Sequence, residues 1–273
     1  MATERKPRRV RRSFKFIFRF FQLIFALVFV FLASFFVTLA LRSPDDADKV
    51  EDKRIAAAET SIGEKIDRIF DIRSAINEKR KSIRHYVLLK DIPRHLRQAI
   101  IAVEDARFYS HKGFDIESIA RAAIVNVEAG EIEEGASTIT QQLVKNLFLT
   151  QERSFTRKVE ELLLAMSVER NYDKDKIIEL YLNTIYFGSN FYGIYEAAHG
   201  YFGKEPKQLT LAESAMLAGI PNAPSVYSPY VNFMLAKKRQ LIVIDAMVRN
   251  HLLTEYEAEK ARIEEIVLKD GYY

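Results

Sequence analysis

A short segment, GASTITQQLVKN from Gly135 to Asn146, gathers side chains that can bind a sugar phosphate. The hydroxyls of Ser137 and Thr138 suit the start of a helix, where they satisfy free backbone N–H groups. Ser137, Gln141 and Lys145 recur every four residues and therefore share one face of that helix. Hydroxyls, amides and an ammonium on one face can hold an oligosaccharide phosphate. The alternative interpretation is a well-capped surface helix without a ligand.

A second set of charges follows in the segment RSFTRKVEELLLAMSVER, which has the periodicity of a helix. Arg153, Arg157 and Glu161 stand four residues apart, so two guanidiniums and a carboxylate share one face. The opposite face carries an apolar stripe, and we expect it to be the buried one. This stripe consists of Val159, Leu162, Leu163 and Met166. An ordinary surface ion pair between Arg157 and Glu161 is the alternative interpretation.

A third candidate group stands at the end of the helix predicted to open near Pro93, just before the segment DARFYSHKG. There Glu104 is exposed to the negative end of the helix dipole and to aromatic neighbours, and both raise the pKa of a carboxyl. A raised pKa is what a general base requires. His111 is expected to brace the loop around Gly113, and acid–base chemistry by His111 is the alternative.

The N-terminal part predicts a membrane anchor. Residues 1–19, the predicted basic cytoplasmic tail, hold eight Lys or Arg residues and one acid, Glu4. Residues 20–41 are 22 uncharged residues rich in Phe, Leu and Val, enough for a helix to cross a hydrocarbon core of about 30 Å. The basic residues before this span place the N-terminus in the cytoplasm and the rest of the chain on the outer face, periplasmic or extracellular. A cleaved signal peptide is the alternative.

This topology accounts for the basic character of the chain. The whole chain has a net charge of +4, the first 19 residues carry +7, and the other 254 therefore carry −3. The charge pattern thus fits a membrane protein and gives no footprint for nucleic acid. The absence of cysteine excludes disulfides, a thiolate nucleophile and a cysteine-based zinc site.

Beyond the span, the pattern predicts two further regions. Residues 42–80 read as a charged helical stem, because isoleucines recur every seven residues at Ile55, Ile62, Ile69, Ile76 and Ile83. Such a stem packs on itself, on the following domain or on a partner. Residues 81–268 read as one mainly helical domain whose last two helices flank a turn near Asn250. No segment alternates well enough to predict a major sheet.

Five blocks together resemble one family. They are EDARFYSHKG (104–113), GASTITQQLVKN (135–146), RKVEE (157–161), KIIELYLNTIYFG (176–188) and ESAMLAGIPNAPSVYSP (213–229). Their order and spacing are similar to those of the peptidoglycan glycosyltransferases, the polymerase module of class A penicillin-binding proteins and of monofunctional transglycosylases. The blocks cover over half of the chain.

The resemblance implies a lysozyme-like, two-lobed helical fold behind the single transmembrane helix, with a groove between the lobes. It implies that the chain polymerises lipid II on the outer face of the cytoplasmic membrane. In this reaction the 4-hydroxyl of an acceptor lipid II attacks the anomeric carbon of a growing glycan on undecaprenyl diphosphate. The products are a β-1,4 glycan, formed with inversion, and the released lipid diphosphate. The membrane and, through the stem, cell-wall synthesis proteins are the other expected partners.

The resemblance also implies a role for each matching residue. Glu104 corresponds to the general base, and Glu161 to a second carboxylate that organises the donor, with a divalent cation (Mg or Mn) on the diphosphate as the expected cofactor. Cations that stabilise the leaving diphosphate are expected at Lys145, Arg153 and Arg157. Donor-site hydrogen bonds are expected from Ser137, Thr138, Gln141 and Gln142. Structural support is expected from His111, Asn183, Tyr186 and Glu213.

The sequence departs from the family pattern in two ways. The stem is helical, where many relatives have a short strand-forming connector. No Ser-x-x-Lys occurs, and 273 residues do not accommodate a transpeptidase domain, so no penicillin-binding activity is expected. Two other functions stay open, a glycan hydrolase with paired carboxylates and a catalytically silent scaffold. A hydrolase has no need of a cationic set for a diphosphate, and a scaffold has no need of the candidate reacting groups.

Overall fold

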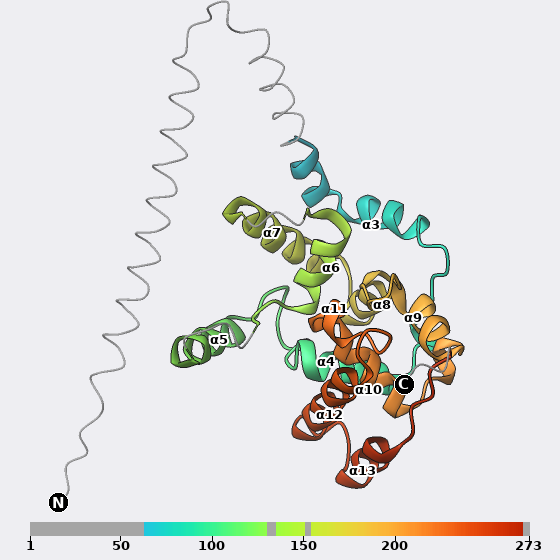
Figure 1. Ribbon diagram of the computed structural model, residues 1–273. Coiled ribbons are helices and arrows are strands. Elements are labelled where there is room, and N and C mark those ends of the chain that lie inside the picture. The colour runs from blue at the N-terminus through green and yellow to red at the C-terminus, as the bar shows by residue number, and fades with distance from the viewer. Residues whose placement is uncertain (1–62, 130–134, 151–153, 270–273) are drawn as a thin grey trace, which may run out of the picture. The chain divides into compact units, whose positions relative to one another are not determined.

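Helices make up almost all of the regular structure in the part of the chain that the computed structural model describes, residues 63–129, 135–150 and 154–269 (Figure 1). The longer ones are α3 Ile72–Lys81, α4 Arg94–Glu104, α5 Ile116–Ala129, α6 Ile139–Phe148, α7 Phe155–Asn171, α8 Lys174–Thr184, α9 Gly193–Phe202, α10 Leu211–Gly219, α12 Phe233–Arg249 and α13 Glu255–Ile263. Short turns of helix are η1 Leu89–Asp91, η2 Pro206–Gln208, η3 Ile220–Asn222 and α11 Pro224–Tyr227. Within these residues β pairing is limited to one isolated bridge, between Tyr186 and Tyr192. The prediction of a mainly helical protein is confirmed for this part.

The predicted basic tail (1–19), the predicted anchor (20–41) and stem residues 42–62 lie outside the described residues, and so does Arg153. In the described ranges, none of the helices combines the length and the apolar character that a membrane crossing requires. The anchor and its orientation therefore stay predictions.

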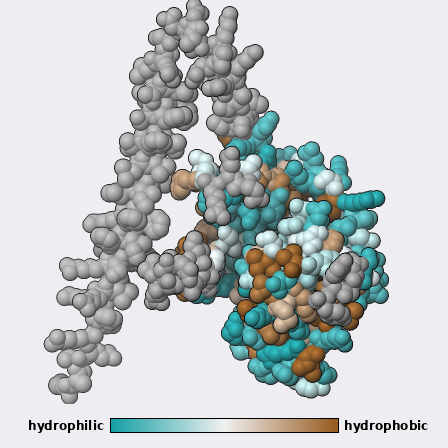
Figure 2. All heavy atoms as spheres, in the orientation of Figure 1, coloured by the Kyte–Doolittle hydropathy of each residue, from teal (hydrophilic) through white to brown (hydrophobic). Residues whose placement is uncertain are grey.

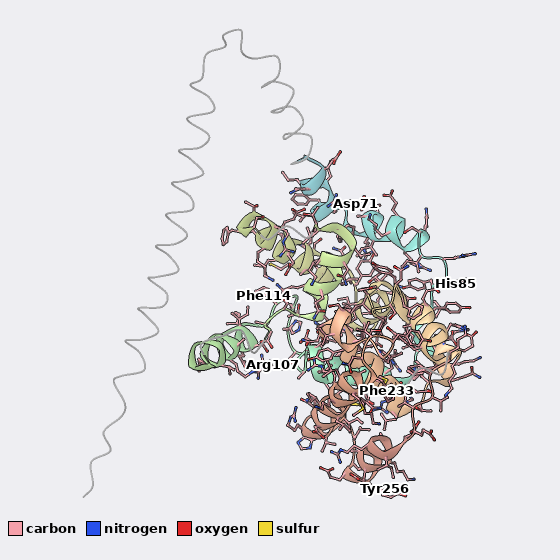
Figure 3. All side chains as sticks on the ribbon, in the orientation of Figure 1. Asp71, His85, Arg107, Phe114, Phe233 and Tyr256 are labelled. Carbon is pink, nitrogen blue, oxygen red and sulfur yellow. The ribbon has the colours of Figure 1, made fainter. Side chains whose placement is uncertain are left out.

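The core of the described domain forms around α10, whose residues from Ala212 to Gly219 are all buried. This helix packs against α4 and α12, and α6 packs against α7 and α8. Four of the eight buried residues of α10 are Ala or Gly, and such small side chains let neighbouring helix backbones approach closely. Side chains are accordingly crowded between these helices in Figure 3. The predicted pair of C-terminal helices is confirmed, because α12 ends at Arg249 with Asn250 as its C-cap, and α13 follows after a short turn.

Helix α7 corrects the prediction about its buried face. Val159, Leu163 and Met166 are 39%, 45% and 49% exposed, and Leu162 is only half-buried. The buried residues are instead Glu161, Leu164, Ala165 and Val168. The predicted stripe was therefore wrong. The physical reason is that α6 covers the side with Glu161, and a carboxylate that finds hydrogen-bond and charge partners can be buried there.

The described end of the stem packs on the domain. Residues 63–70 are helical, Asp71 caps α3, and both Ile72 and Ile76 are 1% exposed. α3 packs against α7, and the Ser167 hydroxyl donates to the carbonyl of Ile69 at 2.6 Å. Lys65 forms an ion pair of 2.9 Å with Glu160 on α7. Residues 63–80 of the predicted stem thus pack against the domain.

Helix α5 stands apart from the other helices in Figure 1. It exposes Ile116, Ile119 and Ile124, which are 69%, 44% and 60% exposed. On α7, Phe155 is 81% exposed beside the apolar residues described above. On the face seen in Figure 2, hydrophilic side chains cover most of the domain, and hydrophobic side chains gather in patches. Helices α5 and α7 thus present apolar side chains that the domain itself does not bury.

Candidate active site

Glu104 is the last residue of α4 and faces the side chains of α6. Its Oε2 accepts a hydrogen bond of 2.8 Å from Nε2 of Gln142, whereas its Oε1 is buried without a partner among the described residues. Burial raises the pKa of Glu104, and Gln142, Arg239 and Lys145 oppose that rise. The sequence also predicted a raised pKa for Glu104, from the helix dipole and aromatic neighbours, but the main cause is loss of water around the carboxyl. A carboxylate with a raised pKa and one free oxygen can act as a general base.

The start of α6 is held by an extensive set of hydrogen bonds. Thr138 is the N-cap and forms a capping box with Gln141, in which each side chain accepts from the other's backbone N–H. The Thr138 hydroxyl also donates to the carbonyl of Gly113 at 2.8 Å. Thr138 and Gln141 are 2% and 1% exposed. Their contacts within the protein position α6, and their predicted contacts with substrate stay predictions.

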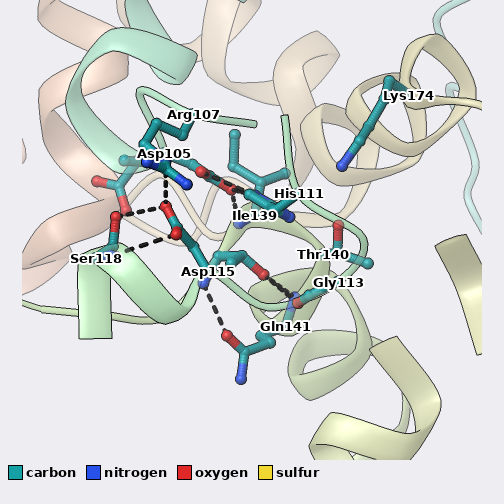
Figure 4. A network of polar contacts seen from close by, with 12 residues as sticks. Asp105, Arg107, His111, Gly113, Asp115, Ser118, Ile139, Thr140, Gln141 and Lys174 are labelled. Atoms are coloured by element: carbon teal, nitrogen blue, oxygen red, sulfur yellow. Dashed lines mark hydrogen bonds and ion pairs between the residues drawn. The ribbon is translucent and has the colours of Figure 1, made fainter. Parts of the chain in front are cut away.

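Asp105 ties the same helix start to the loop after α4 (Figure 4). Its Oδ2 accepts from the backbone N–H of Ile139 at 3.0 Å and lies 2.9 Å from Nε2 of His111. Both side chains of this pair are buried. His111 therefore has the environment of a bracing residue, because it holds Asp105 against the first turn of α6. Arg107 and Phe114 belong to the same connection between α4 and α5 (Figure 3).

Glu161 is the second carboxylate, buried on α7 at 2% exposure. Its Oε1 accepts from Nε2 of Gln141 at 3.2 Å and from the ammonium of Lys158, and its Oε2 lies 3.5 Å from Arg157. The Lys158 ammonium is also 3.4 Å from the exposed Ser137 hydroxyl. The surface-pair interpretation of Arg157 and Glu161 therefore fails, because Glu161 is buried and shared by three groups.

The carboxylates of Glu104 and Glu161 both accept hydrogen bonds from side chains of α6. Gln142 donates to Glu104 and the preceding Gln141 donates to Glu161. Consecutive residues of a helix point about 100° apart, so the two glutamines reach different neighbours, α4 with the base candidate and α7 with the second carboxylate. Lys145 is half-buried one turn further along α6 and acts electrostatically on Glu104. The fold thus gathers in one place the groups that lie far apart in the sequence.

Three of the predicted supporting residues make contacts within the protein, and their supporting role stays a prediction. Asn183 is 3% exposed and bonds to both backbone groups of Val87 and to the carbonyl of Glu179. Glu213 completes the capping box of α10 and pairs with Lys204 at 2.6 Å. Tyr186 stacks on Tyr192 with ring centroids 4.6 Å apart.

Three further residues belong to this site that the sequence interpretation did not single out: Lys158, Arg239 and Tyr181. Lys158 stands three residues before Glu161, so its helical spacing was a usable signal. Arg239 on α12 acts on Glu104, and Tyr181 on α8 bonds to Gln142. Neither has a spacing signal, because tertiary packing alone brings α8 and α12 to the end of α4.

A cavity beside α4 is distinct from these contacts. Its volume is about 340 Å³. It is lined by Arg94, Arg97, Gln98, Ile101, Ala102, Ala106, Tyr109, Asn250 and Leu252. None of the predicted site residues lines it, so the candidate site is defined by the contacts of α6.

The described side chains do not fit a resident metal centre. No three His, Asp or Glu residues of the described ranges come together in a way that would hold an ion. The predicted ligand, Glu161, has one oxygen engaged by Lys158 and Gln141 and the other close to Arg157. Two neighbouring cations take the place that a bound metal would need. A divalent cation thus stays a prediction in the form of an ion that arrives with the substrate diphosphate.

These contacts agree with the relationship found by comparison with known proteins. The profile of the transglycosylase family matches residues 72–248, so the chain belongs to that family. The chain is 50% identical over 183 residues to penicillin-binding protein 1A of Neisseria flavescens, covering 67% of this chain and 23% of that protein. It is 47% identical over 179 residues to penicillin-binding protein 1F of Bacillus subtilis, covering 66% of this chain and 25% of that protein.

A solved structure similar to this chain is penicillin-binding protein 1A from Haemophilus influenzae. The identity is 25%, the TM-score is 0.41, and the match covers 68% of this chain and 18% of that one. The chain thus matches only about a quarter of the length of its curated relatives. The family resemblance of the five sequence blocks is confirmed, and the match begins at residue 72, inside the predicted stem.

Proposed function

We propose that this chain is a peptidoglycan glycosyltransferase that polymerises lipid II into β-1,4 glycan and releases undecaprenyl diphosphate. Membership of the transglycosylase family supports the reaction class. The observation that carries the proposal is the pair of adjacent glutamines, Gln141 and Gln142, which join Glu161 and Glu104 to one helix. Such an arrangement suits a reaction that needs a base on one side and a charged leaving group on the other.

In this mechanism Glu104 accepts the proton of the acceptor 4-hydroxyl. The hydroxyl oxygen bonds to the anomeric carbon of the donor from the face opposite the diphosphate, which gives inversion. The bond between that carbon and the diphosphate oxygen breaks, and its electron pair leaves with the lipid diphosphate. The unpartnered Oε1 of Glu104 supports this role, because a base needs an oxygen that no protein group occupies.

Cations of α6 and α7 are assigned to the leaving diphosphate. Lys145, Arg157 and Lys158 bring positive charge to the α6 and α7 side of the site, and Arg153 is proposed as a fourth cation. Preorganised positive charge stabilises negative charge that develops in a transition state. In this proposal Glu161 keeps Arg157 and Lys158 in place, and a Mg or Mn ion carried by the diphosphate supplies further charge.

The proposal places the domain on the outer face of the cytoplasmic membrane, anchored by residues 20–41, in a lysozyme-like fold of two lobes. The exposed apolar side chains of α5 and α7 support work on lipid-linked substrates. Removal of residues 1–41 should release the protein from bacterial membranes in a carbonate wash. Retention of the shortened protein on membranes would contradict the anchor.

A polymerisation assay tests the function. Detergent-purified protein is incubated with fluorescent lipid II and the glycan is resolved on a gel, for wild type, Glu104→Gln and the control Glu265→Gln, which changes an exposed glutamate. We expect long glycan from wild type and the control, and none from Glu104→Gln. Full activity of Glu104→Gln would refute the assigned base. Soluble fragments released from purified sacculi would instead indicate a hydrolase. Binding of lipid II by wild type without turnover would indicate a scaffold.

A further inference from the structure

Tyr181 lies one step behind the base candidate. It belongs to α8, and its side chain is fully buried. Its hydroxyl donates to Oε1 of Gln142 at 3.0 Å, and Nε2 of the same amide donates to Oε2 of Glu104 at 2.8 Å. Three helices, α8, α6 and α4, are thus joined in one directed chain of hydrogen bonds. The hydroxyl of Tyr181 thus reaches Glu104 through the amide of Gln142.

The direction of this chain depends on Tyr181. An amide side chain has an acceptor oxygen on one side and a donor nitrogen on the other. With the phenol O–H on the oxygen, the NH₂ group must face Glu104. If the amide turned over, its oxygen would face the carboxylate, and two acceptors would then meet in a buried place without a proton between them. The phenol therefore selects the one orientation that suits an ionised Glu104.

Burial keeps the phenol in its donor form. Loss of water, together with the carboxylates of Glu104 and Asp105, raises the pKa of Tyr181 well above its ordinary value. The phenol therefore holds its proton throughout the pH range in which Glu104 titrates.

We propose that Tyr181 is a positioning residue of the transfer reaction. It fixes the amide of Gln142 so that one oxygen of Glu104 is held and the other is left for the acceptor hydroxyl. The inference rests on the proposed function of Glu104. The charged groups that act on this carboxyl are Asp105, Lys145 on α6 and Arg239 on α12, and the Tyr181→Phe change touches none of them.

The test is the pH dependence of the initial polymerisation rate for wild type and Tyr181→Phe. Loss of one buried hydrogen bond should lower kcat about fivefold to tenfold and leave KM for lipid II unchanged. The acid limb of the rate profile should move to higher pH, because a turned amide no longer donates to Glu104 and no longer lowers its pKa. A wild-type rate with a wild-type acid limb would overturn the proposal.

Two matched variants separate this role from simple packing. Tyr201→Phe removes the hydroxyl of another fully buried tyrosine, which donates to the carbonyl of Phe187 at 2.8 Å and is not bonded to Gln142. Its acid limb should stay at the wild-type pH. Gln142→Met should shift the limb as Tyr181→Phe does, and the double variant should be no slower than Gln142→Met alone. Additive losses would overturn the proposal, because Tyr181 would then act by another route.

Circular dichroism shows which variants are folded. If Tyr181→Phe does not fold, the test is the acid limb of Gln142→Met. An acid limb of Gln142→Met at the wild-type pH would then overturn the inference. Glu104→Gln distinguishes this inference from the proposed function. If Glu104→Gln is active, the assignment of Glu104 as the base is refuted. If Glu104→Gln is inactive and Tyr181→Phe has the acid limb of wild type, only the positioning role of Tyr181 is refuted.

Discussion

Replacement of Glu104 by Gln should stabilise the protein while it abolishes polymerisation. The carboxyl group is buried, one of its oxygens has no partner among the described residues, and burial raises its pKa. A raised pKa means that the surroundings favour the neutral form of Glu104 over the charged one. The Gln side chain has nearly the same shape and no charge, so it removes the cost of ionising this group in the folded state.

The sign of the pH dependence follows from this shift. Below the ordinary pKa of 4.5, Glu104 is protonated in both the folded and the unfolded chain, so it contributes no penalty. As the pH rises, the unfolded chain loses this proton first, and the folded state becomes relatively less stable. The penalty is complete above the raised pKa of the folded state. The Gln variant lacks it throughout.

The expected gain is modest. The variant removes only the cost of ionising Glu104, because its amide is still a polar group in the same place. One pKa unit corresponds to about 1.4 kcal/mol, and the attraction of Lys145 and Arg239 for the carboxylate opposes the rise in pKa. We therefore expect a gain of about 1 kcal/mol at pH 8, which corresponds to a rise of about 2–4 °C in Tm for a domain of this size. At pH 4.5 the two proteins should melt closer together.

The assay is thermal unfolding of wild type, Glu104→Gln and Glu265→Gln by circular dichroism at pH 4.5 and pH 8. The exposed Glu265 forms no hydrogen bond or ion pair within the described residues, so its variant should follow wild type at both pH values. A Glu104→Gln protein that melts below wild type at pH 8 would refute the reasoning. So would a difference that is the same at both pH values, since it would come from packing and not from ionisation.

Three other variants or treatments test separate parts of the site. Lys145→Ala should lower kcat/KM by the equivalent of about 2–4 kcal/mol, and a loss below about tenfold would make Lys145 peripheral. Arg239→Ala should move the acid limb of the rate profile to higher pH, because Arg239 lowers the pKa of Glu104; an unchanged limb would exclude that influence. Polymerisation should fall after treatment with EDTA and return with Mg or Mn, whereas full activity in EDTA would contradict a cation on the diphosphate.

Much of the fold was predictable because its signals are local. Ser and Thr before an amide-rich helix predicted the start of α6, and the structure places the N-cap at Thr138. Asn250 was predicted to separate two helices and does so. These features depend on residues a few positions apart, and capping and turn chemistry act over that distance.

The buried side of α7 was not predictable by the same means. Periodicity divides a helix into faces, but it does not say which face the neighbouring helix will cover. The sequence favoured burial of Val159, Leu163 and Met166, whereas the structure buries Glu161 with Leu164 and Ala165. The cause is the contact with Gln141, a residue on another helix that sequence spacing does not connect to Glu161. A carboxylate can be buried when it finds such a hydrogen bond beside the positive charge of Lys158 and Arg157 on its own helix.

The site depends on one rigid element. Helix α6 carries both glutamines, so a rotation of α6 would move the hydrogen bonds to Glu104 and to Glu161 together. Its first turn is held by Asp105 and by the carbonyl of Gly113, both from the loop that directly follows α4 and Glu104. The same segment therefore sets the end of α4 and the start of α6. That arrangement fixes Glu104 relative to Glu161, and it explains why Thr138 and Gln141, which look like ligand-binding residues in the sequence, are buried in hydrogen bonds within the protein.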